Sequence, residues 1–142
     1  MKFFLSLLAL CLGVFSVQAA PEYGTVKVSK VISVYDGDTF RVDIDSLPPI
    51  VGKNIPIRLN GVDTPEIQGK CQQEKDLALE ARDFVRNKLV NAKEIKLSKL
   101  QRGKYFRVVA DVYVDGISLE QELLDNELAY KYTGGKKSSW CN

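Results

Sequence analysis

The segment Ile55–Glu66 reads Ile-Pro-Ile-Arg-Leu-Asn-Gly-Val-Asp-Thr-Pro-Glu and combines a strand with a turn. Residues 55–59 have the apolar spacing of a strand, and Asn60-Gly61 and Thr64-Pro65 both bend the chain. One cation, Arg58, and two carboxylates, Asp63 and Glu66, are therefore expected together at a strand end. Such a cluster can bind a hard metal ion, a phosphate group or both. A polar turn with a surface ion pair has the same composition, so this segment alone does not decide between the two interpretations.

The residues before this segment predict two more strands and a tight turn. Thr25–Val34 carries apolar residues of one parity, including Ile32, and Thr39–Ile44 alternates in the same way. Between them, Asp36-Gly37 is typical of a hairpin turn. Together with residues 55–59, these segments form a meander of three strands.

The second half of the chain predicts a helix, two strands and another helix. A helical pattern covers Gln72–Val90, and strands are expected at Glu94–Leu100 and Arg107–Val114. Ser118 fits the N-cap of the last helix, with Gln121 as its capping-box partner. The residues expected to face inward from the helices are Leu77, Ala81, Phe84, Val85 and Leu89, then Leu119, Leu123 and Leu124.

This order of elements favours an α+β fold, namely a five-stranded Greek-key barrel of the OB-fold type with two helices. OB-type barrels often bind oligonucleotides, but the fold alone does not establish a function.

The composition limits the possible chemistry. The 142 residues suit one domain, and the net charge of +2 permits a local basic surface without indicating a nucleic-acid-binding protein. The chain contains no histidine, which excludes an imidazole base, a histidine-ligated zinc and a Ser-His-Asp triad. An enzyme of this composition would depend on carboxylates, Lys, Arg, Tyr or a metal ion.

Residues 1–19 have the pattern of a secretory signal peptide, and residues 20–142 are expected to form the mature domain. Lys2 precedes the apolar segment Phe3–Val17, and Val17-Gln18-Ala19 resembles a cleavage site. The apolar segment is short for a membrane span, although an uncleaved anchor is the alternative. The mature protein is expected to be secreted or periplasmic and not stably associated with a membrane.

The expected export of the chain also indicates the state of its cysteines. Cys11 lies in the signal peptide, which leaves Cys71 and Cys141 in the mature chain. Two cysteines in an exported chain usually form a disulfide, and two free thiols are the alternative. A disulfide would connect the C-terminal end of the sequence to its middle.

The polar residues at strand ends suggest one site. In a meander, Asp38 and Asp63 could share a hard cation such as calcium, which prefers oxygen ligands. Glu66 would then be a free carboxylate able to accept a proton from water. Arg58 and Arg107 would supply planar donors for phosphate oxygens. These are the components that a phosphodiester hydrolase requires.

The same residues resemble the staphylococcal nuclease (thermonuclease) family. The resemblance rests on Asp36-Gly37-Asp38-Thr39, on Arg58 followed by Val62-Asp63-Thr64-Pro65-Glu66, and on Arg107. It implies an OB-type barrel in a calcium-dependent endonuclease, similar to micrococcal nuclease, that cleaves DNA and RNA and leaves 3′-phosphate ends.

Individual roles follow from the matching positions of this family. The resemblance implies calcium binding by Asp38, Asp63 and the carbonyl of Thr64. It implies catalytic roles for Arg58, Glu66 and Arg107, and substrate binding by Tyr105 and the adjacent Lys104. A monomer is expected.

Three features depart from the family pattern. Phe106 replaces a common glycine, Asp111 replaces an aromatic or apolar residue, and the residues after Leu128 give no sign of the long C-terminal helix. Two other classes of protein are alternatives. A non-catalytic OB-type module that binds nucleic acid would need stacked aromatic residues and a basic groove, but not Glu66. A secreted structural or inhibitor domain would not need the acidic pair.

Overall fold

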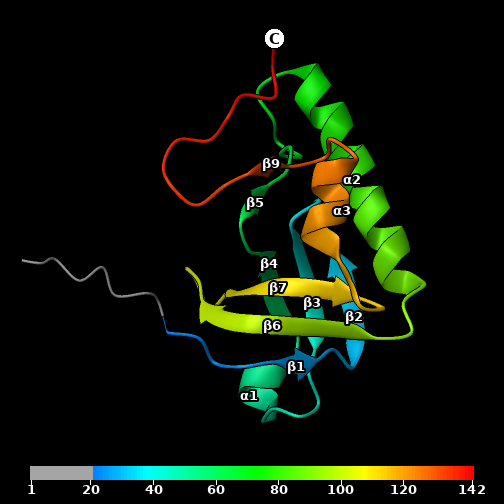
Figure 1. Ribbon diagram of the computed structural model, residues 1–142, viewed down its shortest axis with the longest axis vertical. Helices are drawn as coiled ribbons and strands as arrows, with labels where there is room; N and C mark the ends of the chain where they lie inside the picture. Colours follow the sequence, from blue (N-terminus) through cyan, green and yellow to red (C-terminus); the bar gives the residue numbers. More distant parts are fainter. Residues whose placement is uncertain (1–20) are drawn as a thin grey trace, which may run out of the picture.

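The computed structural model describes residues 21–142, and the predicted signal peptide lies outside them (Figure 1). The described chain is organised around a curled sheet of seven strands. Its strands are β1 (Val26–Lys27), β2 (Lys30–Val34), β3 (Thr39–Asp43), β4 (Ile55–Leu59), β6 (Ile95–Arg102), β7 (Val108–Val114) and β8 (Ile117–Ser118).

The strand order explains why the sheet curls. The order is β1-β6-β7-β4-β3-β2, with β8 beside β7, and only β4 and β7 pair in parallel within it. The two outermost strands, β1 and β2, are consecutive in the chain, so the chain itself connects the two edges. This arrangement confirms the predicted α+β fold of the OB type.

The remaining elements lie outside this sheet. The helices are α1 (Pro49–Gly52), α2 (Gln72–Val90) and α3 (Leu119–Asp125), and a second sheet pairs β5 (Val62–Asp63) with β9 (Tyr130–Lys131). In Figure 1, β5, β9 and the start of α2 lie toward one end of the molecule, whereas β1 and α1 lie at the other. Within residues 21–142, no helix is both long enough and apolar enough to span a membrane.

The prediction of five strands and two helices was too simple. Thr25–Val34, predicted as one strand, forms β1 and β2, because the chain leaves β6 after Val28 and joins β3 from Ser29. The apolar parity predicted through Ile32 is also interrupted. The β2–β3 register shifts between Val31 and Ser33, and this irregularity leaves Ile32 exposed.

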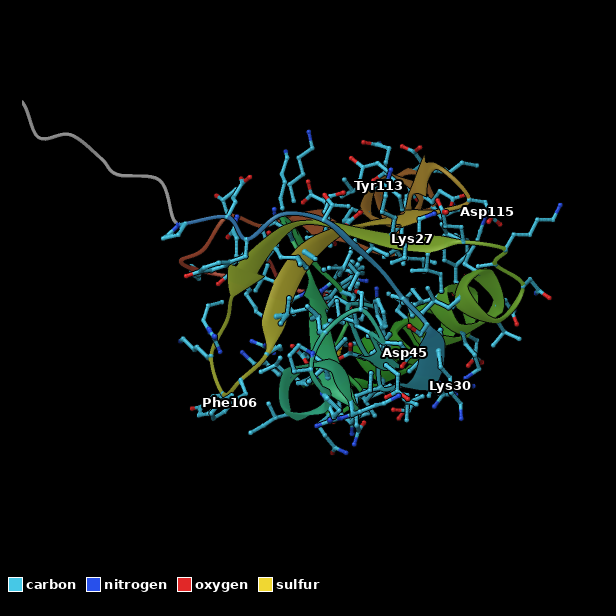
Figure 2. All side chains as sticks on the ribbon, turned by 90° about the horizontal axis from the view of Figure 1, so that it is seen from below. Lys27, Lys30, Asp45, Phe106, Tyr113 and Asp115 are labelled. Atoms are coloured by element: carbon cyan, nitrogen blue, oxygen red, sulfur yellow. A yellow bond between two sulfur atoms is a disulfide. The ribbon has the colours of Figure 1, made fainter. Side chains whose placement is uncertain are left out.

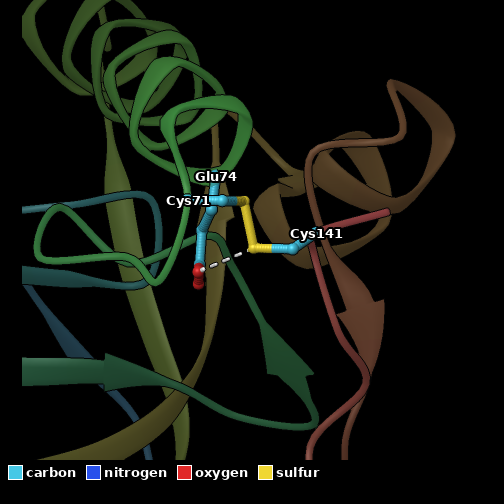
Figure 3. Close-up of side chains that lie close together, drawn as sticks. All are labelled: Cys71, Glu74 and Cys141. Carbon is cyan, nitrogen blue, oxygen red and sulfur yellow. Dashed lines mark hydrogen bonds between the residues drawn. A yellow bond between two sulfur atoms is a disulfide. The ribbon is translucent and has the colours of Figure 1, made fainter.

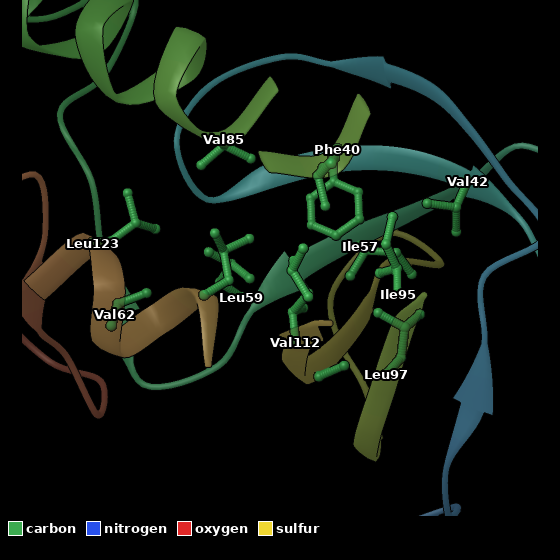
Figure 4. Close-up of a cluster of buried hydrophobic side chains, with 14 of the residues drawn as sticks. Phe40, Val42, Ile57, Leu59, Val62, Val85, Ile95, Leu97, Val112 and Leu123 are labelled. Carbon is green, nitrogen blue, oxygen red and sulfur yellow. The ribbon is translucent and has the colours of Figure 1, made fainter. Parts of the chain in front are cut away.

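The core lies between the concave face of the sheet and the helices α2 and α3. Phe40, Ile57, Leu97 and Val112 from the sheet meet Val85 of α2 (Figure 4). All are almost fully removed from water, so the hydrophobic effect holds the sheet and helices together.

The two helices largely confirm the sequence pattern. Gln72–Val90 has the predicted bounds, but Leu77 and Phe84 are only half-buried, whereas Ala78 and the acidic Glu74 are buried. The helix approaches the barrel closely, which favours the small alanine over the larger side chains.

Ser118 caps α3 as predicted, since its hydroxyl accepts a hydrogen bond from the backbone N–H of Gln121. The capping box is not formed, because the Gln121 side chain donates to Asp125 instead.

Candidate active site

The site begins with the turn between β2 and β3, which packs tightly on the rest of the protein. A Cβ on Gly37 would lie 2.8 Å from Cβ of Ala81 and 2.9 Å from Cγ2 of Thr64. Only glycine therefore lets this turn lie between α2 and the segment after β5. The carbonyl of Asp38 accepts a hydrogen bond from the backbone N–H of Leu59, which ties the turn to the end of β4.

This packing brings together residues that lie far apart in the sequence. Oδ2 of Asp38 accepts a 3.0 Å hydrogen bond from the backbone N–H of Thr64, and it lies 2.7 Å from NH1 of Arg58. NH2 of Arg58 lies 3.7 Å from Oδ1 of Asp63. Arg58 thus contacts both carboxylates that the sequence assigned to a cation.

Asp63 and Glu66 also share a lysine that the sequence did not indicate. Nζ of Lys137 lies 2.6 Å from Oδ1 of Asp63 and 3.0 Å from Oε1 of Glu66. Partial burial alone would lower the pKa of Lys137. Its contacts with these two carboxylates have the opposite effect and together outweigh burial, so the pKa of Lys137 is raised.

Asp36 is a fourth carboxylate of this cluster. It is buried, and its Oδ1 accepts a hydrogen bond from the backbone N–H of Asp38. Burial, and then the negative charge of Asp38, raise the pKa of Asp36 to about 7. Even with Asp36 partly protonated near pH 7, the three carboxylates of Asp38, Asp63 and Glu66 outnumber the two cations that contact them, Arg58 and Lys137, so the site has an excess of negative charge.

The donor set fits a hard metal ion. Oδ1 of Asp63 is buried and has no hydrogen-bond partner among residues 21–142, although it lies within ion-pair distance of Lys137 and Arg58. Asp38 and Asp63 are only 5% and 3% exposed, and their ligand atoms are all oxygen. Oxygen ligands and surplus negative charge are what calcium or magnesium requires.

The segment that carries Glu66 wraps around a buried side chain of α2. The carboxylate of Glu74 accepts hydrogen bonds from the backbone N–H groups of Glu66, at 3.3 Å, and Lys70, at 2.8 Å. A Cβ on Gly69 would lie 2.6 Å from Cγ of Glu74, so a side chain there would displace this segment. Glu74 therefore fixes the backbone on which Glu66 stands.

Glu74 also lies next to the disulfide that Cys71 and Cys141 form, as predicted for two cysteines of an exported chain. Its Oε2 lies 3.9 Å from Sγ of Cys141 (Figure 3). Because both sulfur atoms are in the disulfide, these three residues do not form a thiolate metal site.

No hydrogen bond or ion pair within residues 21–142 joins the other predicted catalytic arginine, Arg107, to the carboxylates. Arg107 directly precedes β7, and Val109, two residues later, is the register partner of Arg58. Strand alternation therefore places both arginines on the same face of the sheet. Nε of Arg107 is buried and has no hydrogen-bond partner in the described part of the chain.

Lys104 and Tyr105 lie in the loop between β6 and β7. Phe106, which is labelled in Figure 2, belongs to the same loop. Tyr105 is 91% exposed, and no hydrogen bond or ion pair within residues 21–142 joins Lys104 or Tyr105 to the carboxylates. Phe106 has a φ of 60°, a left-handed conformation that glycine adopts at less cost.

Sequence reasoning missed three residues of the site. Asp36 was interpreted as a turn former. The signal that could have identified it is the presence of Asp38 two residues later in the same turn. Glu74 was assigned to a helix without a chemical role, although an acid at an inward position of an amphipathic helix indicates a buried partner. No local pattern pointed to Lys137.

Comparison with known proteins identifies the family. The family model described as "Staphylococcal nuclease homologue" matches residues 56–139, which is more than half of the chain. This chain belongs to that family. The staphylococcal nuclease match extends from β4 into the segment after β9, so it includes Asp63, Glu66, Arg107 and Lys137.

Individual relatives agree with this assignment. The chain is 32% identical over 127 residues to a thermonuclease of Staphylococcus hyicus, a match that covers 82% of this chain and 72% of that protein. It is 40% identical over 60 residues to a probable endonuclease of Schizosaccharomyces pombe, covering 42% and 26% of the two chains. It is 31% identical over 84 residues to a probable staphylococcal-like nuclease of Oryza sativa subsp. japonica, covering 59% and 23%. The chain thus spans only about a quarter of the two eukaryotic relatives.

Membership of the staphylococcal nuclease family makes the protein a phosphodiester hydrolase that acts on nucleic acid. Nucleases of this family generally depend on a metal ion, which agrees with the oxygen donors gathered at Asp38 and Asp63.

Proposed function

We propose that this protein is an exported, calcium-dependent endonuclease that hydrolyses DNA and RNA and leaves 3′-phosphate ends. The observation that carries the proposal is the convergence of two buried carboxylates, Asp38 and Asp63, beside the exposed carboxylate Glu66. A cation site next to a free acid is the arrangement needed to hydrolyse a phosphodiester with an activated water.

The metal would be held by Asp38, Asp63 and the carbonyl of Thr64. Calcium fits better than zinc or copper, because the donors are all oxygen and the chain has no histidine. The bound ion would supply positive charge that stabilises the charge developing on the phosphate oxygens.

Glu66 would act as the general base. Its side chain is 49% exposed, so water can reach it, and the site contains no imidazole that could do the same work. Glu66 would take a proton from the attacking water while the oxygen of that water bonds to phosphorus. The bond from phosphorus to the 5′-oxygen then breaks, and this oxygen receives a proton from solvent.

Arg58 and Arg107 would stabilise the reacting phosphate. Both lie on one face of the sheet, and the Nε–H of Arg107 has no hydrogen-bond partner among residues 21–142. Guanidinium groups suit this task because their planar donors can bind two oxygens at once. Lys104 and Tyr105 would contact phosphates farther along the strand.

The test of this proposal compares wild type with Glu66→Gln on plasmid DNA and on RNA. Wild type should cleave both with calcium and neither with a chelator, and the variant should be about a hundred- to ten-thousand-fold slower, as expected for loss of a general base. Glu80→Gln, an equal charge change at an exposed position of α2, should cleave normally. Near-normal turnover by Glu66→Gln would assign the base to another group. Binding without cleavage by wild type would instead favour a non-catalytic OB-type module.

We also propose that residues 1–19 are removed on export and that the mature monomer is secreted or periplasmic, without stable membrane association. The apolar segment Phe3–Val17 and the disulfide Cys71–Cys141 support export. Intact-mass measurement should place the mature N-terminus at Ala20 or within a residue or two. A soluble product that retains the first residues would contradict this expectation.

A further inference from the structure

The last residues of the chain form a segment that is anchored at both ends beside the site. This segment, residues 133–142, is called the tail below. It follows β9, which pairs with β5 so that Tyr130 lies opposite Asp63. Near its other end, Cys141 is bonded to Cys71 at the start of α2, and the ring of Trp140 stacks on Tyr130 with 3.9 Å between centroids. Figure 1 shows the tail leaving β9 and returning toward the start of α2.

The tail brings Lys137 to the reactive carboxylates. Nζ of Lys137 contacts both Asp63 and Glu66, the residues proposed as metal ligand and general base. The Lys137 side chain is nevertheless 43% exposed, so its ammonium group is still open to solvent on one side.

A cleft adjoins this lysine, and it is lined by two further lysines as well as by the carboxylates Asp63, Glu66 and Glu74. The cleft has a volume of about 570 Å³ and lies between the tail and the segment 66–70. Lys70 and Lys136 line it beside Lys137, and neither forms an ion pair within residues 21–142. Exposed lysines without carboxylate partners are available for an anion, and the anion that a nuclease brings to its active site is the phosphate backbone.

A purely structural role explains these features less well. An ion pair of a half-exposed lysine contributes little to the stability of the fold. The formation of this ion pair is therefore an insufficient reason for a disulfide and an aromatic stack to hold the tail beside the site. A metal ion at Asp63 would also repel the Lys137 ammonium group. The flexible stem of lysine would let this ammonium move from Asp63 into the adjoining cleft.

We propose that Lys137 is a substrate-binding residue, and that the cleft it shares with Lys70 and Lys136 binds a backbone phosphate next to the one that is cleaved. The Cys71–Cys141 disulfide acts as a positioning element, because it holds the tail so that Lys137 reaches this phosphate. The inference rests on the proposed function, since it places the cleft beside the scissile phosphate.

The first experiment measures binding rather than cleavage. A fluorescent single-stranded DNA oligonucleotide is titrated with the Glu66→Gln protein in calcium, and anisotropy is followed over a range of salt concentrations. Introducing Lys137→Met into the Glu66→Gln protein should weaken binding about ten- to a hundredfold, as expected for the loss of one charge-assisted hydrogen bond. It should also reduce the slope of log affinity against log salt by about 0.7, the value for one phosphate contact on a single strand.

Two matched variants show whether the positive charge of Lys137 is the cause of the change in DNA binding. Lys137→Arg keeps the cation and should restore most of the affinity and the salt slope. Lys30→Met makes the same charge change at an exposed residue of β2 that forms no ion pair in the described chain, and it should alter neither. Unchanged affinity and salt slope in Lys137→Met would overturn the proposal, as would an equal loss in Lys30→Met.

The positioning role of the disulfide is tested by asking whether its removal and the Lys137→Met change have additive effects on DNA binding. Replacing Cys71 and Cys141 by serine should weaken binding to the extent that Lys137→Met does, and combining the changes should add little, because all of them remove one interaction. Far-UV circular dichroism verifies that the serine variant is folded. Full additivity would overturn the positioning role.

Failure of this inference is distinguishable from failure of the proposed function. If wild type does not cleave but Lys137→Met still lowers the salt slope, the phosphate site stands without the nuclease mechanism. If wild type cleaves and Lys137→Met binds normally, the nuclease proposal stands and this inference is wrong.

Discussion

The backbone N–H of Thr64 donates a hydrogen bond to Oδ2 of Asp38, which lies 26 residues earlier in the chain. This single contact joins the turn after β2 to the segment after β5. It fixes Oδ2 of Asp38 at the residue that follows Asp63, so the proposed cation site depends on the packing of two turns.

The first prediction concerns Asp38→Asn. The amide oxygen can still accept the Thr64 hydrogen bond, but the variant loses the negative charge that pairs with Arg58 and attracts a cation. Calcium affinity should therefore fall at least about tenfold, because calcium affinity follows the number of charged ligands. Isothermal titration with calcium measures this directly, and Asp45→Asn at an exposed position is the control. Unchanged calcium affinity would show that Asp38 is not a ligand.

The second prediction concerns Gly37→Ala. The added Cβ would lie 2.8 Å from Cβ of Ala81, and neither atom can move without moving a backbone. We expect a loss of about 1–3 kcal/mol in unfolding free energy, as for overpacking elsewhere in protein cores, together with weaker calcium binding through displacement of Asp38. Denaturant unfolding measures the first effect.

Ala81→Gly provides the control for this second prediction. It should cost less in the Gly37→Ala background than in wild type, because it removes one of the two colliding atoms. Strictly additive costs would contradict the packing explanation.

The sequence predicted the parts of this molecule that depend on local pattern. The bounds of β4 and α2 and the grouping of Arg58 with Asp63 follow from residues close in sequence. The division of Thr25–Val34 into β1 and β2 could not be predicted in this way, because it depends on which strand each half pairs with. A strand that changes partners has the same alternation as one that does not.

The unpredicted members of the site have a similar physical origin. Lys137 lies 71 residues after Glu66, and it reaches the site only because β9 pairs with β5 and the disulfide holds the tail. Asp36 is buried because Gly37 lets the turn approach α2. Neither relationship can be predicted until the tertiary packing is known. The residues of the Val62–Glu66 motif are close together in the sequence, so their grouping could be predicted from it.

The third prediction concerns pH and a residue outside the site. Glu120 is buried, its carboxylate accepts hydrogen bonds from the backbone N–H of Val112 and the hydroxyl of Ser118, and burial raises its pKa to about 7. A raised folded-state pKa means that the folded protein binds the proton more tightly than the unfolded chain does. The stability from this group is therefore complete below about pH 4.5 and is lost as the pH rises toward 7.

Glu120→Gln tests this third prediction, because glutamine is neutral at every pH. The unfolding free energy of wild type should fall relative to that of the variant between about pH 4.5 and 7, by on the order of 1–3 kcal/mol. Glu127→Gln, at an exposed position, should follow wild type across the range. Parallel stability curves for wild type and Glu120→Gln would contradict the raised pKa.

The last prediction concerns Glu74, a buried residue that supports the segment carrying Glu66, the proposed general base. Its two carboxylate oxygens accept separate hydrogen bonds from the backbone N–H groups of Glu66 and Lys70. In Glu74→Gln one of these oxygens becomes an NH₂ group, which cannot accept, so one backbone N–H loses its partner. The segment 66–70 should then be held less firmly, and kcat should fall about tenfold, because small displacements of a general base are costly. The calcium affinity should change little, since Asp38 and Asp63 keep their contacts. Glu80→Gln, an exposed acid of the same helix, should keep wild-type kcat. An unchanged kcat in Glu74→Gln, or a loss confined to calcium affinity, would show that Glu74 does not position Glu66.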